Sequence, residues 1–165
     1  MQMSKYSRAQ MILHWAVFIL IVVQFVFHEA IVVAFEALLD GKDAIPNPMV
    51  SAHLGIGGLI GILTALRLWI RMEIGTPDEA GNNPKIFAHV AQFVHFSFYA
   101  ILILLPITGG FAWYQTSQSA ADMHTILRAI LLLLVLLHVF AVLVHIFVWR
   151  QNILKRMWPF DFNRH

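Results

Sequence analysis

Four long apolar stretches alternate with short polar segments along the chain. The apolar stretches cover about residues 11–35, 49–70, 86–114 and 126–149. Each is long enough for the roughly 20 helical residues that cross the hydrocarbon core of a bilayer. The polar segments DGKDAIPNP, GTPDEAGNNP and QTSQSAAD contain turn-forming or solvated residues. The pattern predicts an all-α fold, an integral membrane four-helix bundle.

Composition agrees with a membrane protein and excludes several other classes. The chain is 59% hydrophobic and 12% charged, and its mean hydropathy of +0.73 lies outside the range of ordinary soluble domains. No stretch resembles a linker, so residues 1–165 are expected to form a single transmembrane domain. The absence of cysteine excludes disulfides and thiolate ligands. No basic stripe suits nucleic acid, so membrane lipid is the expected surrounding partner.

The basic residues predict the orientation of the bundle. Lysine and arginine concentrate near the N-terminus, in the second polar segment and near the C-terminus, whereas the first and third segments contain mainly Lys42. Cytoplasmic loops of membrane proteins carry the excess of positive charge. Both termini are therefore expected to be cytoplasmic.

Histidines recur at a spacing of 14 residues, as in His14 and His28 and again in His124 and His138. Fourteen residues make nearly four helical turns, which separates side chains on one face by roughly 21 Å. With helices running in alternate directions, His53 and His124 lie near the outer ends of their helices. His14 and His138 lie toward the cytoplasmic side. The spacing predicts two pairs of imidazoles at two depths.

Two imidazoles that face each other in a helix bundle can provide the axial ligands of a planar iron macrocycle. Two haem b groups fit the two pairs best. The segment HLGIGGLIG places Gly57 near His53. Close helix packing is by itself the commoner use of such glycines, and their coincidence with a candidate ligand favours a flat cofactor. Arg67, which follows His53 by 14 residues, is a candidate partner for a haem carboxylate or an interfacial side chain that reaches the headgroups.

Other chemistries find little support. The chain lacks H-E-x-x-H, G-x-S-x-G and a glycine-rich phosphate loop, which argues against a hydrolase. Intramembrane histidine and arginine also occur in proton or ion transporters. That alternative is less favoured because the sequence has no recognisable inverted halves.

Several segments together resemble the bacterial cytochrome b561 family of di-haem, four-helix inner-membrane proteins. They are KYSRAQMILHW, RLWIRMEIGTP, LLPITGG and LLHVFAVLVHIFVWRQNILKRMWP. The resemblance implies that His14 and His138 bind the inner haem and that His53 and His124 bind the outer haem. This assignment agrees with the pairing predicted from depth.

The same resemblance implies a function. A family member oxidises superoxide at the periplasmic face and passes the electrons to ubiquinone, so a superoxide oxidase activity is expected here. His145, His95 and Arg71 are the candidates for a quinone site at the cytoplasmic side, because an imidazole can deliver protons near neutral pH. A purely structural hydrogen bond is the alternative for the two histidines.

The loops expected at the outer face depart from what an anionic substrate requires. They carry Glu36, Asp40, Asp43 and Asp122 against Lys42. An acidic face repels superoxide and attracts a basic protein surface. The alternative function is therefore an electron-transfer or anchor subunit for a periplasmic redox partner protein.

His28 also departs from the family pattern at the level of the outer pair. It is a candidate to hydrogen-bond a haem carboxylate or to replace His53 as a ligand. An interfacial pairing with Glu29 is the simpler interpretation.

Overall fold

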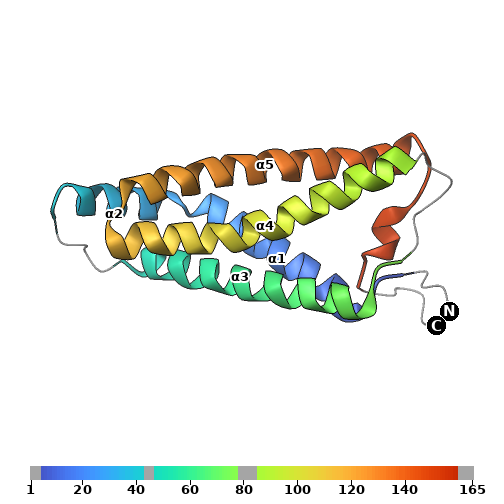
Figure 1. The fold of residues 1–165 in the computed structure, drawn as a ribbon, viewed down its shortest axis with the longest axis horizontal. Coiled ribbons are helices and arrows are strands. Elements are labelled where there is room, and N and C mark those ends of the chain that lie inside the picture. The colour runs from blue at the N-terminus through green and yellow to red at the C-terminus, as the bar shows by residue number, and fades with distance from the viewer. Residues whose placement is uncertain (1–4, 43–46, 78–84, 160–165) are drawn as a thin grey trace.

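The computed structural model describes residues 5–42, 47–77 and 85–159 (Figure 1). The secondary structure of these residues is helical and includes no strand. The elements are α1 (Arg8–Val26), α2 (Glu29–Leu39), α3 (Pro48–Ile74), α4 (Lys85–Gln115), α5 (Gln118–Phe147) and the 3₁₀ turn η1 (Ile153–Arg156). Among them α1, α3, α4 and α5 are long and apolar enough to cross a membrane.

Local capping fixes where the long helices begin and end. Ser7 and Gln10 form a capping box at the start of α1, with each side chain bonded to the other residue's backbone. Asn47 and Ser117 cap α3 and α5 through their side-chain oxygens. Helix α3 ends at Gly75, whose φ of +80° is a conformation that glycine adopts without strain.

The first apolar stretch is not one helix, in contrast to the expected span of 11–35. Helix α1 ends at Val26, and His28 is the residue before α2. The 19 residues of α1 already extend about 28 Å, close to the thickness of the hydrocarbon core. With 11 residues, α2 reaches only about 16 Å and is too short to cross. His14 and His28 therefore do not share one continuous helix.

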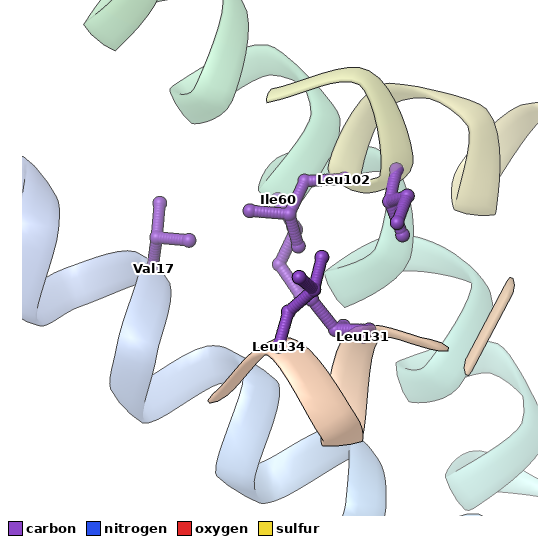
Figure 2. Close-up of a cluster of buried hydrophobic side chains, with 6 residues drawn as sticks. Val17, Ile60, Leu102, Leu131 and Leu134 are labelled. Carbon is purple, nitrogen blue, oxygen red and sulfur yellow. The ribbon is translucent and has the colours of Figure 1, made fainter. Parts of the chain in front are cut away.

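The four long helices pack around a core to which each contributes. Helix α3 contacts α1 and α4, α4 also contacts α5, and α2 lies against α3 at one end of the bundle (Figure 1). Figure 2 shows the centre of the core, where the buried side chains include Val17, Ile60, Leu102, Leu131 and Leu134. Tight packing of α3 on α4 occurs at Gly61, where a Cβ would lie 3.0 Å from Pro106 Cγ.

The lateral surface of the bundle is strongly apolar. Ile62, Phe93 and Phe140 are 67%, 69% and 65% exposed. Soluble monomers rarely expose apolar surface so continuously. In a bilayer this apolar surface would contact lipid chains, and the backbone N–H and C=O groups are hydrogen-bonded within each helix.

Two side-chain hydrogen bonds join distant segments at the end of the bundle opposite α2. Trp15 Nε1 donates to the carbonyl of Met157 at 2.9 Å, and Gln10 Nε2 donates to the carbonyl of Gly75 at 2.9 Å. The start of α1, the end of α3 and η1 therefore meet there. The starts of α3 and α5 lie at the α2 end (Figure 1).

Candidate functional site

A cavity of about 520 Å³ occupies the α2 end of the bundle. This volume falls within the range typical of sites for small organic ligands. Most of the cavity wall is aliphatic or aromatic, and we call it the glycine cavity. Three histidines and four glycines also line it, namely His28, His53, His124, Gly57, Gly58, Gly109 and Gly110.

His124 is held against α4 by its Nδ1 atom. Nδ1 lies 3.0 Å from the carbonyl oxygen of Leu105 and 3.3 Å from Thr108 Oγ1. A carbonyl only accepts, so Nδ1 donates and Nε2 keeps its lone pair for a ligand. A Cβ at Gly109 would lie 3.0 Å from the ring, so any larger residue there would push His124 out of this position by a few tenths of an ångström.

His53 reaches the same cavity from α3. Its Nδ1 is buried without a hydrogen-bond partner among the described residues, and its carbonyl accepts a hydrogen bond from Gln24 Nε2 at 2.9 Å. A Cβ at Gly57 would lie 3.3 Å from that amide nitrogen, so Gly57 also lets α1 approach α3. At Gly58 a Cβ would meet nothing within 4 Å, which leaves the α3 backbone open to the cavity.

The second pair of histidines lies among other rings. The ring centroid of His138 is 6.4 Å from His14, 5.9 Å from His95 and 5.6 Å from Phe98, and Trp15 packs edge-on against His14. We call these five residues the ring cluster. Its His14 Nδ1 is buried without a hydrogen-bond partner in the described part of the chain.

The two sites fit an iron porphyrin better than a bare metal ion. No group of three or more His, Cys, Asp or Glu residues in the described ranges could hold a metal ion. A porphyrin brings its own four nitrogens and needs only two axial imidazoles. In the ring cluster, the 6.4 Å between His14 and His138 is the order of separation needed for two metal–imidazole bonds of about 2 Å plus the ring radii.

Arg67 and Arg71 come together near the ring cluster. They line a cavity of about 10 Å³, roughly the space of one water molecule, and Arg67 Cζ lies 5.8 Å from the centroid of the Tyr99 ring. Arg67 also interacts electrostatically with His14 and His138. We call the lining residues the arginine cluster; they are Tyr6, Gln10, Arg67, Arg71, Tyr99 and Met157.

The three residues expected at a quinone site lie in three different surroundings. His95 belongs to the ring cluster and Arg71 to the arginine cluster. His145 Nδ1 instead lies 2.8 Å from Gln151 Oε1, and its ring contacts Trp149 with centroids 4.5 Å apart. His95 also interacts electrostatically with Arg71, so these two residues are neighbours, whereas the contacts of His145 are with Gln151 and Trp149.

Several residues near the sites were missed by the sequence analysis. Arg128 lines the glycine cavity one helical turn after His124, and the spacing of four residues could have revealed it. Gly109 lies within the segment LLPITGG, and nothing in that segment indicates that Gly109 lies against His124. Asp43, expected in the acidic outer loop, lies outside the described residues.

Four apolar helices with imidazoles grouped in their interior define a membrane cytochrome of the b type. The sequence model of the prokaryotic cytochrome b561 family matches residues 5–160, and the chain belongs to that family. It is a multi-pass electron-transfer protein of the bacterial inner membrane, and its family uses haem b.

Two relatives extend over nearly the whole chain. Cytochrome b562 of Cereibacter sphaeroides is 29% identical over 152 residues, covering 92% of this chain and 94% of the relative. The probable superoxide oxidase CybB of Yersinia pestis is 27% identical over 181 aligned positions, covering 94% of this chain and 97% of the relative.

Proposed function

We propose that the protein is a di-haem b cytochrome that moves electrons from a periplasmic donor to ubiquinone, with superoxide as the donor. The observation that carries the proposal is the presence of two imidazole pairs on one bundle. Their members on α5, His124 and His138, are 14 residues apart, or roughly 21 Å along the helix. The name of the Yersinia pestis relative, probable superoxide oxidase, supports superoxide as the donor.

In this proposal each pair of histidines provides the axial ligands of one haem. His53 and His124 would hold one haem in the glycine cavity, and His14 and His138 would hold the other in the ring cluster. Haem b bound at these sites supplies iron that exchanges single electrons. The hydrogen bond from His124 Nδ1 to Leu105 fixes the ring orientation and leaves Nε2 as the ring nitrogen available to a ligand.

The α2 end faces the periplasm in this proposal, and the arginine cluster lies toward the cytoplasm. The basis is the positive charge of the segments at the opposite end, including Arg8 at the start of α1 and Lys155 and Arg156 in η1. Basic residues accumulate on the cytoplasmic side of inner-membrane proteins. Both termini are then cytoplasmic.

Ubiquinone would be reduced at the cytoplasmic end. Arg67 and Arg71 can donate hydrogen bonds to a quinone oxygen, since arginine carries five N–H donors. His95 is next to His138 in the ring cluster, so it can act between the haem site and the quinone. His145 is hydrogen-bonded to Gln151 and would relay protons to the same end of the bundle.

A second candidate function is electron transfer from a periplasmic redox protein. It is favoured by the acidic residues of the α2 end. Glu36 and Asp122 line the glycine cavity, and Asp40 follows α2, where Lys42 Nζ pairs with it at 3.0 Å. Carboxylates in this position would attract a basic docking surface and oppose the approach of superoxide.

Rapid mixing of the oxidised protein with superoxide distinguishes the two functions. For a superoxide oxidase we expect reduction of the haem absorbance at a rate constant near the diffusional ceiling of about 10⁸ to 10⁹ M⁻¹s⁻¹. Added ubiquinone should then restore the oxidised spectrum. A rate constant orders of magnitude lower that rises with ionic strength would contradict superoxide as the donor and favour the redox protein.

A further inference from the structure

Arg128 is a charged side chain in the wall of the glycine cavity. It lies on α5 one turn beyond His124 and lines the cavity with His53, and it interacts electrostatically with both histidines. Side chains of a helix point back toward its N-terminus. The guanidinium of Arg128 therefore extends toward the level of His124.

Arg128 lies where the apolar part of α5 begins. The residue comes ten positions after Gln118, the first residue of α5, and directly before the uninterrupted apolar run of residues 129–137. Its side chain is only partly exposed. A partly buried positive charge is costly unless it is paired and hydrogen-bonded.

No protein group neutralises Arg128 in the described part of the chain. Glu36 and Asp122 also line the cavity, but neither forms an ion pair with Arg128 there. Asp122 instead accepts a hydrogen bond from Gln118 at 2.7 Å. Arg128 is therefore a charged side chain without an ion pair among the described residues, in the wall of a cavity that also carries two candidate haem ligands.

We propose that Arg128 binds a carboxylate of the molecule that occupies the glycine cavity, namely a propionate of its haem b. The inference rests on the proposed function, since it requires a haem between His53 and His124. A guanidinium matches a carboxylate through two parallel N–H···O hydrogen bonds. Such a pair would relieve the unpaired charge and fix the rotation of the haem about its axial ligands.

The test compares natural haem with its dimethyl ester, which has no free carboxylate, in wild-type protein and in Arg128→Gln. The readout is the rate at which haem transfers to excess apomyoglobin. Each haem site should give its own kinetic phase, and the phase that is absent in His124→Ala is assigned to the glycine cavity. We expect Arg128→Gln to speed loss of natural haem about tenfold or more. Esterification should do the same in wild-type protein. Combining both changes should add little, because both remove one interaction.

A matched control removes a positive charge from the same end of the molecule without affecting the cavity. Lys42 is exposed and paired with Asp40, so Lys42→Gln should leave both phases unchanged. If Arg128→Gln does not accumulate as folded protein, Arg128→Lys replaces it. Lysine keeps the charge but loses the two-pronged geometry, so the effect of esterification should shrink without vanishing.

Two results would overturn the proposal. If esterified and natural haem leave the wild-type cavity at the same rate, Arg128 does not bind a haem carboxylate. If Arg128→Gln speeds the loss of both haems equally, Arg128 binds a free anion or only stabilises the fold. A wild-type protein with no haem in the cavity would instead refute the proposed function, which separates the two failures.

Discussion

In the glycine cavity His53 and His124 lie on the wall of an open volume of about 520 Å³, whereas in the ring cluster His138 is surrounded by three rings at 5.6–6.4 Å. Glycines keep the first site open. Aromatic and imidazole rings fill the second. The family uses haem b, and in the proposed di-haem protein the two ends would hold this flat group in different ways.

The difference determines what each site should tolerate. In the glycine cavity, His124 is fixed by a hydrogen bond and by contact with a glycine backbone. Added volume should therefore disturb it. In the ring cluster, His138 has two neighbouring imidazoles, His14 and His95. The identity of the axial partner is the sensitive point there.

The largest expected effect comes from removing one ligand on α5. We predict that His124→Ala loses the haem of the glycine cavity and keeps the other, and that His138→Ala does the reverse. Each should halve the haem-to-protein ratio of purified protein, measured as the pyridine haemochrome. His53→Ala should behave like His124→Ala.

His28 provides the matched control, since it lines the same cavity but is not assigned as a ligand. His28→Ala should retain two haems. If His28→Ala loses a haem while His53→Ala retains both, the pairing proposed for the glycine cavity is wrong.

The ring cluster can be tested by comparing its two imidazoles next to His138. We predict that His14→Ala loses the haem of the ring cluster, whereas His95→Ala retains it with a changed reduction potential because a polar neighbour is removed. Haem content and a redox titration followed by absorbance provide the measurement. Loss of haem from His95→Ala, with normal content in His14→Ala, would reassign the ligand.

Added volume should affect the glycine cavity less than loss of a ligand. A Cβ at Gly109 would lie 3.0 Å from the His124 ring, so Gly109→Ala must displace the ring. Overpacking of this kind costs about 1–3 kcal/mol, and we expect a several-fold weaker hold on the haem of that cavity. Thermal unfolding and haem content measure both effects.

Gly55→Ala is the control for Gly109→Ala, because a Cβ at Gly55 would meet nothing within 4 Å. It should leave haem content unchanged. Equal losses in the two variants would mean that helix flexibility, and not contact with His124, determines the effect.

The smallest effect should come from the hydrogen bond between Gln24 and the His53 carbonyl. Gln24→Leu removes one neutral hydrogen bond, which corresponds to about 0.5–1.5 kcal/mol. We expect a small fall in thermal stability with two haems retained. Gln118→Leu, which removes an exposed bond to Asp122, should change stability less. A larger loss in Gln118→Leu would contradict this ranking.

The spans and the grouping of histidines could be predicted because they depend on local sequence. The length of an apolar stretch determines whether it can cross a bilayer, and residue spacing determines which side chains share a helical face. Residue spacing and helix direction predict one level for His53 and His124 and another for His14 and His138. The structure brings each pair into one neighbourhood.

The remaining features depend on how helices approach one another. The polar pair His28 and Glu29 lies at the break before α2, but such a pair within an otherwise apolar stretch does not by itself indicate that a helix ends. Gly57, Gly58 and Gly109 look alike in sequence, yet a Cβ would meet an amide, open space and an imidazole respectively. Likewise, no spacing argument indicates that His95 on α4 meets His138 on α5.

The most direct test of the account is the haem content of the purified wild-type protein. Two imidazole pairs, one in the glycine cavity and one in the ring cluster, predict two haem b groups per chain by pyridine haemochrome and quantitative amino-acid analysis. Both should have the low-spin spectra of bis-imidazole ligation. A stoichiometry of one haem per chain, or a colourless protein, would contradict the central claim that both histidine pairs hold haem.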